Sequence, residues 1–197
     1  MVIRRIMVLT KGDKYNEKNK ITIWHQQFQT TDYRAFFIDF TKSEKNLDFK
    51  TSDVKSAIRD LAQKNQITSF IQLIEDALHN LSSQDFKKFD EKYIKAFFVG
   101  FASLSNLYFI KSEPEIEKKY PDIMFLYRPP FFPKYQFLFE LKYLSKTGEK
   151  NLKSKTDKAV DQVKEYLKFE EVRSLKKLKA YVLIFVGNEV RVVKEVS

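Results

Sequence analysis

The chain contains no cysteine and only two histidines, His25 and His79, among its 197 residues. The lack of cysteine excludes disulfides, thiolate catalysis and cysteine-based zinc sites, and it is compatible with a reducing compartment. Two histidines are too few for a histidine-rich metal site, so a bound metal would have to be held by aspartate and glutamate oxygens. Such ligands favour Mg²⁺, Mn²⁺ or Ca²⁺.

Glycine and long hydrophobic runs are scarce as well. Four glycines are too few for a Walker loop or a dinucleotide-binding fingerprint, each of which needs several closely spaced glycines. The apolar N-terminal stretch is cut short from Lys11 onward, and the most apolar segment, 96–110, is interrupted by Ser103, Ser105 and Asn106. We therefore expect no signal peptide and no membrane span, and a cytoplasmic location.

Negative charge is in the minority. The 36 lysines and arginines exceed the 26 aspartates and glutamates, which gives a net charge of +10 and a pI near 9.5. This excess suggests a polyanionic partner, with nucleic acid ahead of an anionic membrane surface. The alternative is that the lysines only keep the chain soluble, and net charge alone does not decide between the two.

Hydrophobic periodicity predicts a chain of mixed α and β elements. Helical spacing of apolar residues is found over 53–65, 68–81, 83–105 and 155–169. Aromatic and β-branched composition predicts strands over 107–111, 123–128, 135–141, 179–187 and 189–196. Before these, we expect short extended segments within residues 1–28 and a short helix after Thr30. A soft domain boundary is expected near residue 83, between an N-terminal extended and helical region, 1–82, and a mixed α/β domain, 83–197.

Two charged residues lie at the end of an otherwise hydrophobic strand. Alternation along the strand 135–142 places Glu140 and Lys142 on the same side. Charges in such a strand are costly unless they are paired or used. The simpler interpretation is an exposed cross-strand ion pair that contributes about 0–1 kcal/mol.

Asp122 opens the preceding strand directly after Pro121. The two strands have a short connection, so antiparallel pairing would bring Asp122 close to Glu140. Neighbouring carboxylates repel each other, and a bound divalent cation would relieve that repulsion. Glu113 is a candidate for a third oxygen ligand, with Glu115 and Glu117 as competitors. Taken alone, Asp122 would equally suit a turn after a proline.

These residues resemble the motif of the PD-(D/E)XK nuclease superfamily. Pro121-Asp122 is followed by Glu140-Leu141-Lys142, with Glu140 placed 18 positions after Asp122, inside the element order α-β-β-β-α-β. The wider chain resembles the nuclease domain that follows an AAA-type ATPase-like domain in a large group of uncharacterised bacterial proteins. Residues 7–10 resemble the end of the ATPase-like portion, so we expect this chain to be the carboxyl-terminal piece of a longer architecture.

The resemblance implies a restriction-endonuclease-like α/β fold and a Mg²⁺- or Mn²⁺-dependent nuclease, with DNA as the expected substrate. It implies that Asp122 and Glu140 are metal ligands together with the Leu141 carbonyl, that Glu113 completes the acidic cluster, and that Lys142 orients the attacking water or stabilises developing charge. It also implies that Gln162 points toward the site, and that Tyr166 contacts substrate or braces Gln162. The chain departs from the family where a glycine-rich turn usually precedes the aspartate, since 117–120 is Glu-Lys-Lys-Tyr.

Lysines follow the proposed metal-binding strand, at Lys146, Lys150, Lys153, Lys155 and Lys158. They are either a cationic rim that contacts phosphates or a solvated loop and helix surface. In the loop 128–133 we expect Phe131 and Phe132 to pack on the helical region rather than to stack on unpaired bases. The competing functional hypotheses are a catalytically silent nuclease-fold module that works with an ATPase domain or partner, and a protein-interaction domain built on 53–105.

Overall fold

The computed structural model describes residues 49–80 and 90–197. The elements in this part of the chain are the helices α4 (Thr51–Lys64), α5 (Thr68–His79), α6 (Glu91–Ser103), α7 (Leu152–Tyr166) and α8 (Glu170–Arg173), the short 3₁₀ helix η2 (Lys146–Asn151), and the strands β1 (Tyr108–Ser112), β2 (Ile123–Tyr127), β3 (Gln136–Leu144), β4 (Leu178–Val186) and β5 (Glu189–Val196). The elements expected before residue 49 lie outside the described residues, as does the start of the helix expected from residue 83.

The five strands form one mixed sheet in the order β1-β2-β3-β4-β5. The first three strands form an antiparallel meander, β3 and β4 run parallel, and β5 returns antiparallel to β4. Because parallel neighbours need a crossover connection, η2, α7 and α8 lie between β3 and β4 in the chain. The element order from α6 to β5 confirms the predicted α/β class.

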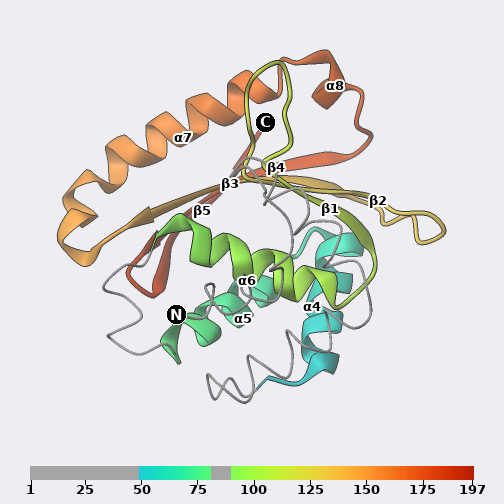
Figure 1. Ribbon diagram of the computed structural model, residues 1–197, viewed down its shortest axis with the longest axis horizontal. Coiled ribbons are helices and arrows are strands. Elements are labelled where there is room, and N and C mark those ends of the chain that lie inside the picture. The colour runs from blue at the N-terminus through green and yellow to red at the C-terminus, as the bar shows by residue number, and fades with distance from the viewer. Residues whose placement is uncertain (1–48, 81–89) are drawn as a thin grey trace, which may run out of the picture.

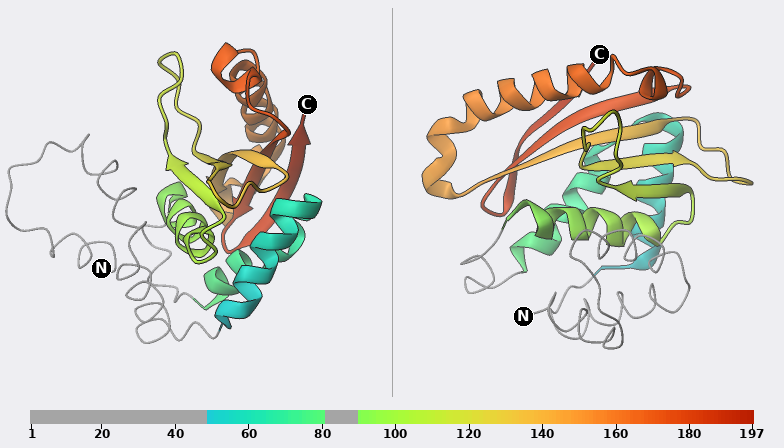
Figure 2. Two further views of the ribbon diagram at one scale, coloured as in Figure 1. Left: turned by 90° about the vertical axis from the view of Figure 1, so that its right-hand side faces the viewer. Right: turned by 45° about the horizontal axis from the view of Figure 1, so that its top comes forward.

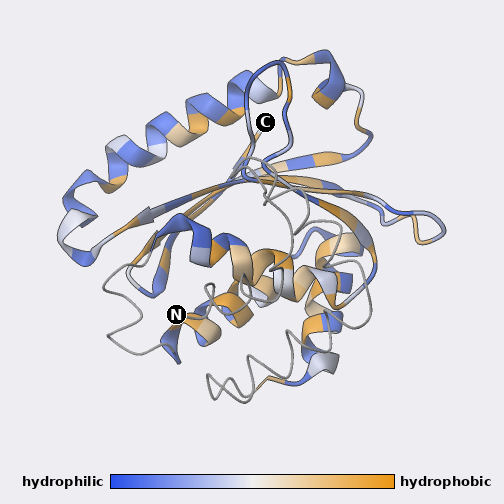
Figure 3. Cartoon of the chain, in the orientation of Figure 1, coloured by the Kyte–Doolittle hydropathy of each residue, from blue (hydrophilic) through white to orange (hydrophobic). Residues whose placement is uncertain are grey.

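Helices cover both faces of the sheet. Figure 1 shows α7 above the sheet and α4, α5 and α6 below it, and the left view of Figure 2 shows the same two layers from the side. The exposed side of α7 is hydrophilic along its length, whereas α5 and α6 carry long hydrophobic stretches (Figure 3). The sheet is therefore the middle layer of a three-layer domain.

Side chains alternate along β3, so this strand contributes to the hydrophobic core on each face of the sheet. Phe137, Phe139 and Leu141 belong to the core under α4, α5 and α6, whereas Leu138 belongs to the core under α7. The aromatic rings pack in contact, with the Phe98 and Phe139 centroids 5.5 Å apart. This alternation is the one predicted from the strand pattern, and it determines which face each charged residue of β3 joins.

Residues 49–80 share the core of the sheet. The α4 and α5 patterns bury the predicted apolar faces, including Leu61 and Phe70. The Tyr135 amide donates to the Ala62 carbonyl at 3.1 Å, and the Val190 amide donates to Glu75 Oε1 at 2.7 Å. Helices α4 and α5 are therefore joined to the sheet region by hydrogen bonds as well as by apolar packing.

The loop between β2 and β3 differs from the expectation. Phe131 and Phe132 are 50% and 65% exposed, so the expectation that they pack on the helical region was wrong. The tip of the loop projects beyond α4–α6 at the end of the hairpin (Figure 1). In the described part of the chain, no helix is both long and apolar enough to cross a membrane.

Candidate active site

The register of β2 and β3 brings Asp122 next to Glu140. Ile123 pairs with Phe139, so Asp122, one residue before β2, lies beside Glu140 in β3. The Leu141 amide donates a hydrogen bond to Asp122 Oδ2 at 2.8 Å. Because the N–H and C=O of one strand residue face the same neighbour, the Leu141 carbonyl lies on the Asp122 side of β3 as well.

Glu140 is almost completely enclosed. Its exposed fraction is 1%, and its Oε1 accepts a hydrogen bond from Lys142 Nζ at 2.6 Å. Its Oε2 is buried and has no hydrogen-bond partner among the described residues. Burial and the nearby negative charge of Asp122 raise the pKa of Glu140 to about 7. A buried carboxylate oxygen without a partner is costly, which makes this oxygen the least satisfied group of the site.

Lys142 joins three carboxylates. Besides its contact with Glu140, its Nζ lies 3.6 Å from Asp122 Oδ2 and 3.7 Å from Glu91 Oε1. Burial disfavours its charged form, but the charges of Asp122 and Glu140 outweigh burial and raise the pKa of Lys142. The ammonium group is therefore a fixed positive charge in the middle of the site.

A second lysine, Lys95 of α6, contacts the Asp122 oxygen that faces away from Lys142. Its Nζ lies 2.6 Å from Glu113 Oε1 and 2.8 Å from Asp122 Oδ1, and its side chain is 11% exposed. Burial opposes its charge, but Asp122 and Glu113 raise the pKa of Lys95. Glu113 thus reaches the site through Lys95, while its own side chain is 38% exposed.

Glu91, in the first turn of α6, is the fourth carboxylate. Burial raises its pKa first, and the charge of Asp122 adds to this. Sequence reasoning missed both Glu91 and Lys95. The available clue was their spacing of four residues, which places them on one helix face, with Lys95 inside a buried apolar stretch where an unpaired lysine would be costly.

Gln162 and Tyr166 lie together on α7, as the predicted one-turn spacing implies. Gln162 Nε2 donates to the Tyr166 hydroxyl at 2.6 Å, and that hydroxyl donates to the Tyr120 carbonyl at 3.4 Å. Tyr166 is 1% exposed. Burial, together with the charge of Glu140, raises the pKa of Tyr166 to about 12. Tyr166 therefore braces the chain just before Asp122.

The five lysines of the predicted rim differ in position. Lys155 is half-buried and lies near enough to Glu91 for its charge to oppose the rise in the pKa of Glu91. The other four are exposed on η2 and α7, namely Lys146, Lys150, Lys153 and Lys158. The structure thus brings one of the five to the acidic network and leaves the others in solvent beyond it.

The segment before Asp122 reaches a tight turn without glycine. Ile116 and Lys119 exchange two backbone hydrogen bonds, each 2.8 Å long. Between them, Glu117 and Lys118 have φ values of 48° and 63°, in the left-handed region that glycine adopts most easily. A tight turn therefore precedes Asp122, and non-glycine residues form it.

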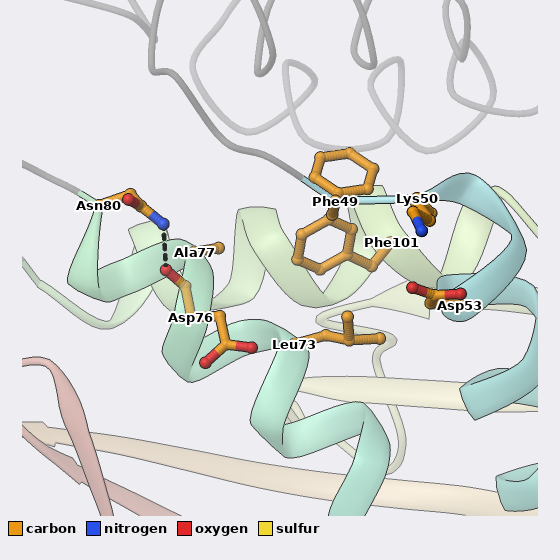
Figure 4. Close-up of a pocket in the computed structure, with 8 residues that line it drawn as sticks. All are labelled: Phe49, Lys50, Asp53, Leu73, Asp76, Ala77, Asn80 and Phe101. Atoms are coloured by element: carbon orange, nitrogen blue, oxygen red, sulfur yellow. Dashed lines mark hydrogen bonds between the residues drawn. The ribbon is translucent and has the colours of Figure 1, made fainter.

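A separate pocket lies between α4, α5 and α6 and shares no residue with this ion-pair network. Figure 4 shows its walls, where the Phe49 and Phe101 rings meet edge to face and Asn80 Nδ2 donates to the Asp76 carbonyl at 2.8 Å. The pocket is lined by Phe49, Lys50, Asp53, Leu73, Asp76, Ala77, Asn80 and Phe101. It contains no arrangement of acids and bases like that around Asp122.

The donor set fits a hard divalent cation in its chemistry. Asp122, Glu140 and the Leu141 carbonyl offer oxygen ligands only, as Mg²⁺ and Mn²⁺ prefer. Glu140 Oε2 is a buried carboxylate oxygen without a partner in the part of the chain that the structure describes. The remaining carboxylate oxygens near it are engaged by Lys95, Lys142 or the Leu141 amide. Across residues 49–80 and 90–197, no group of three acidic or histidine side chains has the spacing of a metal site.

The sheet topology, the crossover through α7 and the carboxylate–lysine site together define a restriction-endonuclease-like domain. A family model described as the PD-(D/E)XK nuclease superfamily matches residues 89–195, more than half of the chain. The chain belongs to this superfamily, and membership indicates a nuclease. The matched segment contains the whole ion-pair network, from Glu91 to Lys142. No curated protein matches the chain.

Proposed function

We propose that this protein is a Mg²⁺- or Mn²⁺-dependent nuclease that hydrolyses phosphodiester bonds, with DNA as its substrate. One observation supports this most strongly. In a chain of the PD-(D/E)XK superfamily, Glu140 is buried next to Asp122 and Lys142, while its Oε2 has no hydrogen-bond partner within residues 49–80 and 90–197. A folded protein retains such an unfavourable group mainly where function requires it.

Asp122, Glu140 and the Leu141 carbonyl would hold the metal ion in this proposal. When bound, the ion would polarise the scissile phosphate and lower the pKa of a bound water. Glu113 was expected from the sequence as a further ligand. Its carboxylate instead accepts a hydrogen bond from Lys95, and it adds a negative charge to the cluster around Asp122. The Leu141 amide holds the Asp122 carboxylate in place, so the orientation of Asp122 does not depend on the ligand.

Lys142 supplies the positive charge of the proposed mechanism. Its ammonium lies against Glu140 and near Asp122, where it would orient the attacking water and offset the negative charge that grows on the phosphate. Tyr166 stays protonated because its pKa is about 12, so its hydroxyl acts as a hydrogen-bonding brace and not as a base. Gln162 fixes that hydroxyl.

Positive charge supports a nucleic acid as the substrate, and the restriction-endonuclease-like fold is the reason for proposing DNA. The chain carries +10 overall, and the exposed lysines of η2 and α7 follow directly after the site strand β3. Phosphate contacts of this kind give affinity without sequence preference. The proposed phosphate-binding rim consists of Lys146, Lys150, Lys153, Lys155 and Lys158.

The test is a cleavage assay with single- and double-stranded DNA and RNA at low salt. We expect cleavage of DNA with Mg²⁺ or Mn²⁺, none with chelator, and loss of cleavage in Asp122→Ala and Glu140→Gln. Lys142→Met should lower the rate about 10²–10³-fold, as for other groups that stabilise transition-state charge. Glu171→Gln, at an exposed position of α8, is the matched control and should cleave normally. Intact nucleic acids under all conditions would refute the proposal.

A second candidate is a catalytically silent nucleic-acid-binding or regulatory module that works with an ATPase-like domain or partner. It is favoured by one observation: lysines already engage Asp122 on both of its oxygens, so a metal would have to compete with them. In that case DNA binding would fall steeply with salt, and no divalent cation would produce cleavage. The same assay separates the two functions.

A further inference from the structure

Lys95 occupies a place in the acidic network that no motif assigns to a lysine. It lies on the buried side of α6, next to Ile94 and one turn before Phe98. Its Nζ lies between Glu113 Oε1, at 2.6 Å, and Asp122 Oδ1, at 2.8 Å. An ammonium enclosed in this way is retained only if its partners compensate the loss of water, and here two carboxylates do so.

The Asp122 carboxylate divides the network into two halves. Oδ1 faces Lys95, whereas Oδ2 faces the Leu141 amide and Lys142. On the Oδ1 side, Lys95 sits between two carboxylates at distances that leave no room for a second cation. On the Oδ2 side, Lys142 is close to Glu140 Oε1, at 2.6 Å, but 3.6 Å from Asp122 Oδ2. Glu140 Oε2 has no partner among the described residues, so a carboxylate oxygen is left for a metal ion on this side.

The charges of the network match a single divalent ion. Four carboxylates, those of Glu91, Glu113, Asp122 and Glu140, are in contact with two ammonium groups, those of Lys95 and Lys142. Lys155 acts on Glu91 through its charge and is not counted among these ion pairs. The ion-paired groups carry four negative and two positive charges, a net charge of −2 when all six are ionised. One divalent cation neutralises this charge, whereas two would leave an excess of +2 in a largely buried cluster, which is unfavourable.

We infer that Lys95 acts as a built-in cation that occupies the Glu113–Asp122 half of the site and limits the protein to one divalent metal ion, bound on the Glu140 side. This inference rests on the proposed function and adds the stoichiometry of metal binding to it. Lys95 is a positioning residue in this scheme, since it also fixes the Asp122 carboxylate between α6 and β3.

The number of Mn²⁺ ions bound per chain tests the inference directly. Isothermal titration calorimetry, with electron paramagnetic resonance of free Mn²⁺ as a second readout, should give one ion per chain for the unmodified protein. Lys95→Met keeps the length of the side chain but removes its charge, and should bind two ions. Lys95→Arg keeps the charge and should bind one. In the double variant Lys95→Met/Glu113→Gln, the second ion should be lost, because its proposed ligand is missing.

The outcomes distinguish a failure of this inference from a failure of the proposed nuclease function. Two ions in the unmodified protein, or one ion in both the unmodified protein and Lys95→Met, overturn the inference and leave the metal-dependent nuclease intact. No ion in the unmodified protein but one in Lys95→Met contradicts the proposed function and also the inferred stoichiometry of one ion, since Lys95 would then block metal binding altogether. No ion in either overturns both. Circular dichroism establishes that each variant is folded, and Lys95→Gln replaces Lys95→Met if the latter is not.

Discussion

The Leu141 amide donates a hydrogen bond to the Asp122 carboxylate at 2.8 Å. The backbone of β3 therefore holds the side chain of Asp122, the candidate catalytic residue just before β2. This bond lies one residue before β2 begins, and it takes the place of a further hydrogen bond between the backbones of β2 and β3. Asp122 is therefore structural as well as chemical, and its two roles are separable by mutation.

Asp122→Ala should be less stable than Asp122→Asn by about 1–3 kcal/mol. Alanine leaves the buried Leu141 amide without an acceptor, which costs the desolvation of that donor, whereas asparagine still offers a carbonyl oxygen. Both variants should be inactive, because neither carries the charge of Asp122. Urea unfolding at pH 7 in the presence of chelator measures the difference. Equal stability of the two variants would show that the 2.8 Å bond contributes nothing.

Glu140→Gln should stabilise the metal-free protein at pH 8. Burial raises the pKa of Glu140 to about 7, above its ordinary value of 4.5, so ionisation costs more in the folded than in the unfolded state. The destabilisation is absent below pH 4.5, grows between pH 4.5 and 7, and is complete above pH 7. The variant should therefore gain on the order of 1–3 kcal/mol at pH 8 and little at pH 5. Thermal unfolding with chelator tests this, and a gain independent of pH would contradict it.

Lys153→Ala and Lys158→Ala should each weaken DNA binding in a salt-dependent manner. If each lysine contacts one phosphate, its removal lowers the slope of log affinity against log salt by about 0.9. The Glu140→Gln background allows binding to be measured without cleavage, for example by fluorescence anisotropy. Lys64→Ala, on α4 and paired with Asp60, is the matched control. Unchanged slopes for the rim variants would assign these lysines to solubility alone.

Lys118→Gly should stabilise the protein by up to about 1 kcal/mol. Relief of the left-handed strain is worth about 1–2 kcal/mol, and the greater unfolded-state entropy of glycine offsets about 0.4–1 kcal/mol of it. Lys118 has a φ of 63° in the turn before Asp122, a conformation that glycine adopts without a steric penalty. Lys119→Gly, at the end of the same turn, is the control and should be neutral or destabilising, since Lys119 is not among the residues with positive φ. Chemical unfolding compares the two variants, and greater stability of the control would contradict the explanation.

Glu195→Gln should destabilise the protein at neutral pH but not in acid. Glu195 accepts hydrogen bonds from Lys179, Tyr181 and Asn65, and the bond from Lys179 contributes most to lowering the pKa of Glu195. A lowered pKa adds stability that is present above the unfolded value of 4.5 and is lost as the pH falls through the folded value. The melting temperatures of variant and unmodified protein should converge below pH 4.5. Glu171→Gln, on the surface of α8, should differ little at any pH.

The meander and the strand faces were predictable because they depend on short-range patterns. The alternation along 135–142 assigned Phe139 to one core and Glu140 to the opposite face, and the short hairpin between β2 and β3 brought Asp122 to the same end. The final strand was predicted with the bounds that the structure has, 189–196. These features need only a period of two and a knowledge of which strands are neighbours in the chain.

The contributions of α6 to the site were not predictable in the same way. That Lys95 meets Asp122 depends on the rotation and height of α6 against the sheet, which the packing of Phe98 on Phe70 and Phe139 determines. The exposure of Phe131 and Phe132 depends on how far the hairpin projects beyond the helices. Both are tertiary properties, and a helical or strand period contains no information on them.

Strand β3 continues five residues past Phe139, the last residue that it pairs with β2. A strand that outruns its neighbour in this way offers a template for the backbone of another molecule, and natural proteins guard such edges with charge. Here the Asp122 carboxylate accepts from the Leu141 amide and so closes the first position of the strand edge beyond β2. Variants that remove this carboxylate consequently also free a strand amide for pairing with another chain, so their solubility should be assessed separately from their activity.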